Sequence, residues 1–314
     1  MSKAGVFLRA PAKVNWTLEV LSQRSDGYHE VRTILQTLWT QDELALDLAD
    51  EIGLSVRGVT NGLRAAPPHI RRWARQIEVP ESNLAYHAAC LLRTRARYRG
   101  GAQIRLRKRI PLAAGLGGGS SDAAATLLGL RHLWRLDISG EELVAIAAEL
   151  GSDVPFFLRG GTALASGRGE RIEPLPDAAK QRLVIAWPKP AHRIPNKTAR
   201  MYAALRPEHY TDGSRTERLA ERLRAGKPVR DEDVFNVFEG VLPEVDPPAA
   251  ELFERAATFG IGQPHLAGAG PAFFFLTQVQ LAEPLLDAFD RLGLQAGQTE
   301  TLPAAGAVVV TSTE

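Results

Sequence analysis

Glycines and small polar residues are concentrated in one stretch of the sequence, residues 115–122. Its glycines are Gly115, Gly117, Gly118 and Gly119, and they are followed by Ser120, Ser121 and Asp122. Glycine permits positive φ and lets a ligand approach the backbone, because it has no Cβ. Ser and Asp are favoured N-cap residues, so a helix is predicted over residues 123–133. A loop that leads into a helix N-terminus offers N–H groups and a positive dipole end, which predicts a phosphate site.

This loop differs from two common phosphate-binding motifs. It has no Lys-Ser/Thr pair after its glycines, so it is not a Walker A loop. Ser120 stands where a dinucleotide-binding fingerprint needs Gly or Ala, which excludes that motif as well. A tight turn is the alternative interpretation, but it would account for one or two glycines rather than four.

The N-terminal segment, residues 6–20, carries polar residues whose spacing places them on one face. It predicts an extended, apolar-rich chain broken at Pro11. Lys13 and Asn15 are two positions apart, so both point to one face of a strand, with Val14 and Trp16 on the other. Taken alone, two polar residues on one strand face are most often simply exposed to solvent. The following turn, residues 24–29, has Asp26-Gly27 at its tip and presents Tyr28 and His29.

A second carboxylate, Asp153, follows a predicted amphipathic helix over residues 141–150 that Gly151 ends. The apolar run Val-Pro-Phe-Phe comes directly after it. This setting predicts a partly desolvated carboxylate. The residues alone leave open whether Asp153 takes part in chemistry or caps the next turn.

The elements that must position these residues can be read from their periodicity. In the first half we expect one or two strands over residues 33–48, a loop or short helix over 55–82, a helix over 83–92 and a strand over 103–110. In the second half we expect strands over 182–187, 271–277 and 306–312 and helices from 198 and over 214–225, 248–259 and 280–292. This order predicts helices packed on an antiparallel sheet.

Composition restricts the class of protein. A chain of 314 residues has room for two domains, and 45% apolar with 24% charged residues is ordinary for a globular protein. The single cysteine, Cys90, excludes an intramolecular disulfide and is typical of a reducing compartment, so we expect a cytoplasmic protein. No apolar run approaches the length of a membrane span, and a net charge of +2 requires no polyanionic partner. The cationic residues of 93–109 suggest a nucleic-acid surface, but Arg105 and Arg107 alternate with Ile104 and Leu106 as on a half-exposed strand.

The loop at residues 111–122 resembles the Pro-x-x-x-Gly-Leu-Gly-Ser-Ser motif of the GHMP kinases, which phosphorylate small molecules. Three further motifs follow the family's order: Pro-Ala-Lys-Val-Asn (11–15) with Asp-Gly-Tyr-His (26–29), Gly-Ser-Asp-Val-Pro-Phe (151–156) and Gly-Ala-Gly-Pro (268–271). The extra glycines and the Asp-Gly-Tyr-His element resemble one branch of this family in particular. The last motif departs from the family at Ala269, where Ser or Thr is usual.

The resemblance implies an α+β fold of two domains. Residues 1–170 would form the ATP-binding domain, similar to domain 2 of ribosomal protein S5. Residues 171–314 would form a ferredoxin-like domain that contributes to the substrate site. The implied ligands are ATP, Mg²⁺ and a small diphosphocytidyl substrate, with neither nucleic acid nor membrane as a partner, and we expect a monomer or weak homodimer.

The resemblance also assigns roles to single residues. Asp153 would be the catalytic base, with Lys13 neutralising charge beside it. The nucleotide would contact Asn83, Lys108, Leu112, Ala113, Ala114, Gly115, Leu116, Gly117, Gly118, Gly119, Ser120, Ser121 and Asp122. The substrate would contact Asn15, Tyr28, His29, Tyr202, Gly268 and Gly270. Asn83 is equally well read as a helix N-cap, a lone helical tyrosine such as Tyr202 is more often a core residue, and either Ser120 or Ser121 could lie near Mg²⁺.

Two other functions fit parts of this pattern. A GHMP kinase for homoserine or a mevalonate derivative would share three motifs, but the Asp-Gly-Tyr-His element argues against it. A non-catalytic protein of the same fold, or an RNA-binding protein that uses residues 93–109, would not need both Lys13 and Asp153.

Overall fold

The computed structural model describes residues 5–58, 82–189, 194–306 and 311–313. In these residues eight strands form a larger sheet and four form a smaller one. The larger sheet has the order β12-β1-β2-β4-β3, with β5 and β6 continuing from β2 and β8 beside β1. Its strands are β1 (Gly5–Gln23), β2 (His29–Ala49), β3 (Gly53–Gly58), β4 (Gly101–Lys108), β5 (Thr162–Ser166), β6 (Arg171–Pro174), β8 (Phe235–Asn236) and β12 (Thr311–Thr313).

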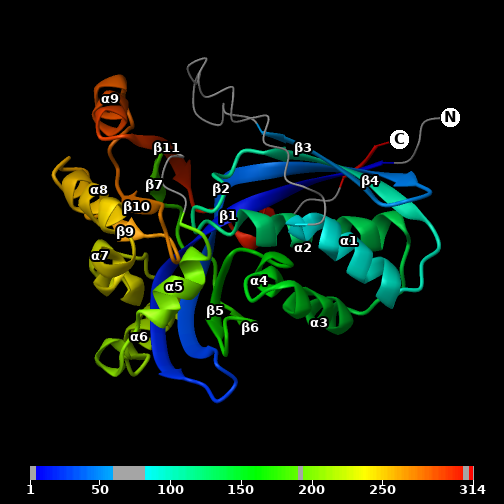
Figure 1. The fold of residues 1–314 in the computed structure, drawn as a ribbon, viewed down its shortest axis with the longest axis horizontal. Helices are drawn as coiled ribbons and strands as arrows, with labels where there is room; N and C mark the ends of the chain where they lie inside the picture. The colour runs from blue at the N-terminus through cyan, green and yellow to red at the C-terminus, as the bar shows by residue number, and fades with distance from the viewer. Residues whose placement is uncertain (1–4, 59–81, 190–193, 307–310, 314) are drawn as a thin grey trace.

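Helices α1 (Leu84–Arg95), α2 (Gly118–Leu133) and α3 (Gly140–Leu150) lie together on one side of the larger sheet (Figure 1). Small residues let α2 lie close to the strands. Ala123, Ala124 and Ala125 are fully buried, and a Cβ on Gly129 would come within 2.5 Å of Leu46 Cδ1. The N-terminus of α2 is thereby fixed against β1 and β2.

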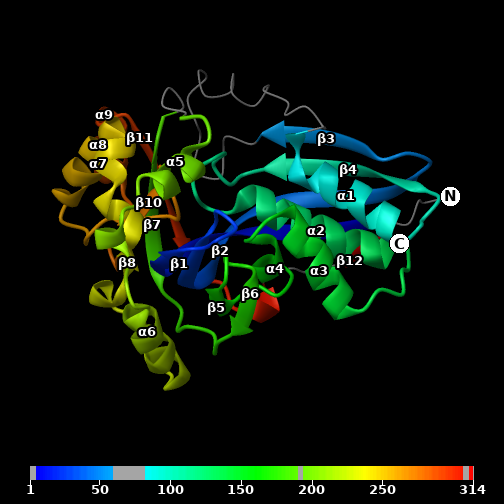
Figure 2. The same ribbon diagram turned by 60° about the horizontal axis from the view of Figure 1, so that its bottom comes forward.

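The smaller sheet has the strand order β11-β7-β10-β9, and all of its pairs are antiparallel. Its strands are β7 (Arg182–Pro188), β9 (His265–Leu266), β10 (Phe273–Leu276) and β11 (Leu294–Glu300), and its connections include α5 (Lys197–Ala203), α6 (Ser214–Arg224), α7 (Leu242–Val245), α8 (Pro247–Ala257) and α9 (Glu283–Arg291). In chain order this is the 4-1-3-2 arrangement of a ferredoxin-like unit, as expected. Helices α8 and α9 cover the face turned away from the larger sheet (Figures 1 and 2).

The two sheets share a hydrophobic core. Phe273 and Phe275 pack with Phe289 under the helices, whereas Phe274 points to the opposite face. There the Phe274 ring lies 5.8 Å from the ring of Trp16 on β1, edge to face. Trp16 is fully buried, which confirms the predicted core-facing side of the N-terminal strand. The mixed α+β class with two sheets is confirmed.

Several expected elements differ in detail. β1 runs through Pro11 instead of breaking there, because a bulge between Pro11 and Lys13 absorbs the irregularity. Residues 33–48 belong to one long strand, β2, and residues 55–58 belong to β3 rather than to a loop; residues 59–81 of that predicted loop lie outside the described residues. β11 was not predicted, since it directly follows α9 with little apolar alternation.

The last strand lies in a different sheet from the one expected. Residues 306–312 were predicted to belong to the sheet of the second half, but β12 (Thr311–Thr313) pairs with β1 in the larger sheet. The boundary at residues 170 and 171 stays a prediction; β6, which begins at Arg171, still pairs with β5. The chain therefore enters the smaller sheet at β7 and returns to the larger one at its end.

Candidate active site

The glycine loop turns sharply into helix α2. Gly115 and Gly117 have φ of 84° and 72°, in the left-handed region that favours glycine. Gly117 is the N-cap of α2, so the helix begins at Gly118. The expectation that Ser120, Ser121 and Asp122 cap this helix is wrong, because the turn at Gly117 places all three inside its first turns. The N-terminal N–H groups of α2 consequently begin at the glycines themselves.

Backbone hydrogen bonds hold this loop on both sides. Lys13 N–H of β1 donates to Leu116 O at 2.9 Å, and Ala272 N–H donates to Ala114 O at 3.1 Å. A Cβ on Gly115 would lie 2.0 Å from Ala267 O, so the glycine loop and the loop 267–272 are in direct backbone contact. The glycine loop is therefore fixed between β1 and the second half of the chain.

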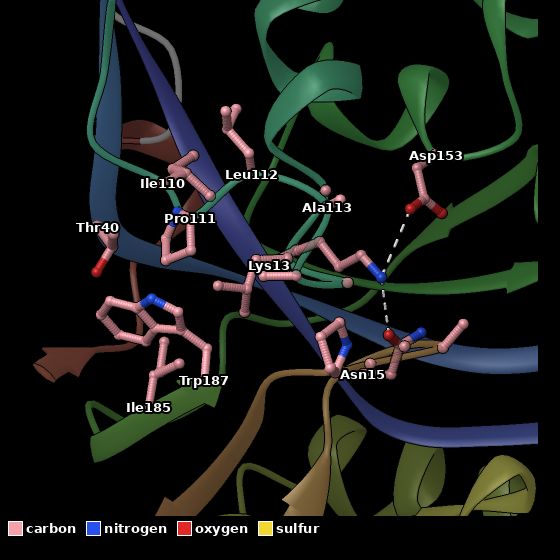
Figure 3. A pocket seen from close by; sticks show the side chains of 18 of the residues that line it. Lys13, Asn15, Thr40, Ile110, Pro111, Leu112, Ala113, Asp153, Ile185 and Trp187 are labelled. Carbon is pink, nitrogen blue, oxygen red and sulfur yellow. Dashed lines mark hydrogen bonds and ion pairs between the residues drawn. The ribbon is translucent and has the colours of Figure 1, made fainter. Parts of the chain in front are cut away.

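Lys13 brings the N-terminal motif and the carboxylate of Asp153 together. Its Nζ lies 3.5 Å from Asp153 Oδ2 and donates to Asn15 Oδ1 at 2.9 Å (Figure 3). Asn15 Nδ2 donates in turn to Thr33 Oγ1 at 2.8 Å. Lys13 and Asn15 lie on the same strand face, as their spacing predicts, and both are buried, so the alternative of solvent exposure is wrong. Hydrogen bonds thus fix the ammonium group beside the carboxylate.

Asp153 stands at the start of the short helix α4 (Val154–Phe157) but makes no capping hydrogen bond with its side chain. The capping interpretation of Asp153 is therefore unsupported. Its side chain is 34% exposed, compared with 6% for Lys13. A carboxylate of this kind, partly open and beside a buried cation, can accept a proton from a bound hydroxyl group.

A buried cluster of charges lies behind the loop. Lys108 Nζ contacts Asp42 and donates to Asp122 Oδ2 at 2.6 Å. Asp42 also accepts hydrogen bonds from the N–H groups of Arg109 and Ile110. Burial by itself lowers the pKa of Lys108, but the two carboxylates raise it overall; burial raises the pKa of Asp122. Lys108 thus connects β4, β2 and α2.

Aromatic side chains gather among the residues that were predicted to contact the substrate. The rings of His29 and Tyr202 are stacked with centroids 5.0 Å apart, and Phe238 meets Tyr202 edge-on at 4.9 Å. Burial, followed by the charge of Asp153, raises the pKa of Tyr202, and burial lowers that of His29. Tyr28 is exposed, and the guanidinium of Arg168 lies 4.8 Å above its ring. His29 and Tyr202 are thus brought together from opposite halves of the chain.

The loop around Gly268 and Gly270 borders the same space. These glycines have φ of 55° and 68°. The N–H of Gly270 donates to Ala267 O at 2.8 Å within the loop itself. Asn236 Nδ2 donates to the carbonyls of Leu266 and Gly268, both at 2.8 Å, and so fixes the loop from the other side.

A cleft of about 2600 Å³ connects these groups. Most of the predicted site residues line it, namely Lys13, Asn15, Tyr28, His29, Lys108, Leu112, Ala113, Ala114, Gly115, Leu116, Gly117, Ser120, Asp153, Tyr202, Gly268 and Gly270. Asn83, Gly118, Gly119, Ser121 and Asp122 are not among its lining residues. Asn83 is an N-cap whose Oδ1 accepts from Ala85 N–H at 2.9 Å, as one of its two interpretations predicted. Its contact with a nucleotide stays a prediction.

The side chains suit a magnesium ion that is held mainly by phosphate. Among the described residues, no group of three or more His, Cys, Asp or Glu side chains is arranged to hold a metal. Ser120 lines the cleft, whereas Ser121 is fully buried. Mg²⁺ commonly keeps water and phosphate oxygens as most of its ligands, so one hydroxyl group at this position fits it.

Two residues of the site, Asp42 and Arg168, were not predicted from the sequence. Asp42 lies on the same face of β2 as the buried Leu44 and Leu46, and a carboxylate at a core position of an alternating strand could have been noticed. Arg168 lines the cleft over Tyr28 and is preceded only by glycine-rich sequence, which gave no comparable signal. The cationic row of β4 is as predicted: Arg105 and Arg107 are exposed and pair with Asp47 and Glu43.

Comparisons with known proteins agree with this geometry. Residues 83–161 match the family model of the GHMP kinases N terminal domain. The chain is 38% identical over 297 residues to the 4-diphosphocytidyl-2-C-methyl-D-erythritol kinase of Dehalococcoides mccartyi, with 94% of this chain and 98% of that protein covered. A relative of the same name from Shouchella clausii is 37% identical over 271 residues, which cover 86% of this chain and 85% of that protein.

Solved structures give the same fold. A crystal structure of 4-(cytidine 5'-diphospho)-2C-methyl-D-erythritol kinase has a TM-score of 0.72 and 35% identity, and the match covers 94% of this chain and 98% of that one. The homoserine kinase of Cytophaga hutchinsonii has a TM-score of 0.67 at 17% identity, with 99% and 98% covered. At that identity the likeness shows the fold alone.

Proposed function

The chain belongs to the 4-diphosphocytidyl-2-C-methyl-D-erythritol kinases of the GHMP kinase family, and we propose that it transfers the γ-phosphoryl group of ATP to the 2-hydroxyl of 4-diphosphocytidyl-2-C-methyl-D-erythritol. This is a step of the non-mevalonate isoprenoid pathway. The observation that carries the proposal is the pair Lys13 and Asp153, 3.5 Å apart, beside a glycine loop at a helix N-terminus. A kinase needs these parts together, a base, a cation and a phosphate cradle.

Asp153 accepts the proton of the attacking hydroxyl group in this mechanism. Its carboxylate opens to the cleft, and no cap interaction occupies it. Lys13 neutralises charge on the transferring group, and the hydrogen bonds that it donates to Asn15 Oδ1 and Leu116 O keep it in place. Positioning of this kind and charge neutralisation account for most of the catalysis in phosphoryl transfer.

The phosphates would lie at the N-terminal N–H groups of α2. Gly115 and Gly117 give the loop its left-handed turns, which expose the helix N-terminus to the cleft. Lys108 forms ion pairs with Asp42 and Asp122. Its role toward the nucleotide is therefore to hold in place the chain that leads into the glycine loop. Ser120 would contact Mg²⁺, which when bound neutralises charge on the β- and γ-phosphate oxygens.

The nucleoside of the acceptor would lie against the aromatic groups. Tyr28, His29 and Tyr202 line the same cleft as Asp153, and Gly268 and Gly270 would let the backbone approach the substrate closely. All of these residues come from a single chain, so we expect a monomer or weak homodimer to be active. Both substrates are phosphorylated metabolites, and we propose the cytoplasm as the compartment. Among the described residues, no helix combines the length and the apolar character that crossing a bilayer requires.

The test is a coupled assay of ADP release with ATP and a panel of acceptors. The diphosphocytidyl substrate should be phosphorylated, and homoserine and mevalonate should not. Asp153→Asn serves as the control for contaminating kinases. Faster turnover of homoserine or mevalonate than of the diphosphocytidyl substrate would contradict the proposal.

A further inference from the structure

Lys197, the first residue of α5, places an ammonium group beside the loop that contains Gly268 and Gly270. Its Nζ lies 3.4 Å from the position that a Cβ would take on Gly270. Lys13 Nζ lies 3.2 Å from the corresponding position on Gly268. Both lysines line the cleft. The loop therefore has one ammonium group at each of its two glycines.

The surroundings of Lys197 leave its charge available to a ligand. Its side chain is 10% exposed, and its Nζ donates to Asp246 Oδ2 at 2.7 Å. Asp246 is itself buried and uses Oδ1 to accept from Ala249 N–H, as the N-cap of α8. An ammonium group has three donors, and within the described part of the chain Asp246 is the acceptor recorded for Lys197. Burial lowers the pKa of Lys197, although Asp246 counteracts it.

A purely structural role explains these facts less well. Two charges buried between α5 and α8 stabilise a fold no better than apolar side chains of similar volume would. The positive charge of Lys197 would serve to bind an anion that enters the cleft at Gly270. Because Gly270 has no Cβ, such an anion could approach the ammonium group. Phosphate is the anion that the proposed reaction brings to this cleft.

Resting on the proposed kinase activity, we propose that Lys197 binds the diphosphate of the nucleotide substrate, on the opposite side of the loop from Lys13. Tyr202, the residue proposed to stack on the base, lies on the same helix. The two positions are separated by about 7.5 Å along the helix axis, a distance that a ribose can span. The phosphates of ATP are the other source of phosphate, but their predicted place is the N-terminus of α2.

The test compares two competitive inhibitors, cytidine and CDP, which differ only in the diphosphate. In the wild-type enzyme CDP should bind more tightly than cytidine. Lys197→Met should reduce this ratio about 10- to 100-fold, the usual effect of losing a hydrogen bond to a charged group. The inhibition constant of cytidine and the KM of ATP should change less than threefold.

Matched variants separate binding from folding. Lys197→Met leaves Asp246 unpaired and could unfold the chain, so the double variant Lys197→Met with Asp246→Asn removes both charges and keeps an N-cap acceptor for α8. It should fold normally and still lack the CDP preference. Lys180→Met removes an exposed lysine outside the lining of the cleft and should behave as wild type.

The outcomes distinguish this inference from the proposed function. If the wild type phosphorylates the diphosphocytidyl substrate but the folded variants keep its preference for CDP, then Lys197 only pairs with Asp246. A rise in the KM of ATP with an unchanged CDP preference would assign the ammonium group to ATP and also overturn the inference. An inactive wild type would instead refute the kinase activity itself.

Discussion

Replacing Gly115 by alanine tests whether the phosphate loop must touch the loop 267–272. The new Cβ would lie 2.0 Å from Ala267 O. Nonbonded heavy atoms prefer separations of about 3.5 Å, so the two loops would have to part by on the order of 1 Å or more. Gly115 also has φ of 84°, a left-handed conformation that costs an L-residue about 1–2 kcal/mol.

The displacement should be felt mainly in catalysis. Gly115 lies between Ala114, whose carbonyl accepts from Ala272, and Leu116, whose carbonyl accepts from Lys13. A shift of about 1 Å in a positioning loop can cost about 100-fold in rate, so we expect kcat/KM for both substrates to fall by about that factor. The assay is steady-state ADP release, with a melting curve on the same preparation.

Gly293→Ala is the matched control for Gly115→Ala. Gly293 has φ of 80°, close to that of Gly115, but a Cβ there would meet nothing within 4 Å. It should therefore lose similar backbone stability and keep its kcat/KM. If Gly115→Ala kept kcat/KM within threefold of the wild type, contact between the two loops would not position the phosphates.

Three further predictions follow from the site. Asp153→Asn should lower kcat by about 10²–10⁴ with little change in ATP affinity by calorimetry, and a near-normal kcat would exclude it as the proton acceptor. Tyr202→Ala should raise KM for the diphosphocytidyl substrate about 5- to 150-fold with kcat nearly unchanged, while Tyr202→Phe stays near wild type; a destabilised enzyme with unaltered KM would make Tyr202 a core residue. Burial raises the pKa of Glu239 from 4.5 to about 7. The folded chain then keeps a proton that the unfolded chain releases, so the free energy of unfolding should fall by on the order of 3 kcal/mol as pH rises from about 4.5 to 7. Urea denaturation of Glu239→Gln should lack this component, and an unchanged pH slope would contradict it.

Short-range patterns allowed the sequence to predict much of the site. The shared face of Lys13 and Asn15 depends only on the alternation of a strand, and the turn into α2 depends on adjacent glycines. Both features depend on local structure alone, so they hold in any fold in which these segments are extended or helical. The N-cap was predicted several residues too late because Ser and Asp are favoured at that position, whereas the left-handed turn at Gly117 already starts the helix.

Long-range pairing could not be predicted in the same way. Asp42 meets Lys108 only because β2 pairs with β4, and Lys197 meets Asp246 only because the start of α5 lies at the junction of α7 and α8. The pairing of β12 with β1 depends on the chain's return to the larger sheet after the smaller one is complete. Local periodicity does not predict these pairings, because each depends on which apolar surfaces of the fold remain exposed until another element packs on them.

The division of positive charge explains how a loop without a lysine of its own can bind ATP. Lys108, a buried cation shortly before the loop in sequence, is paired with two buried carboxylates. Its ammonium group is already paired with both carboxylates beside α2, so this cluster serves to fix the helix on the sheet rather than to attract phosphate. In the proposed complex the charge of the phosphates would then be met by the N–H groups of α2, by Mg²⁺ and by Lys13. Because Lys13 also faces Asp153, neutralisation is placed at the group that is transferred rather than along the whole nucleotide. Stabilisation that acts on the transferred group favours the transition state over bound ATP, which is the condition for a rise in kcat.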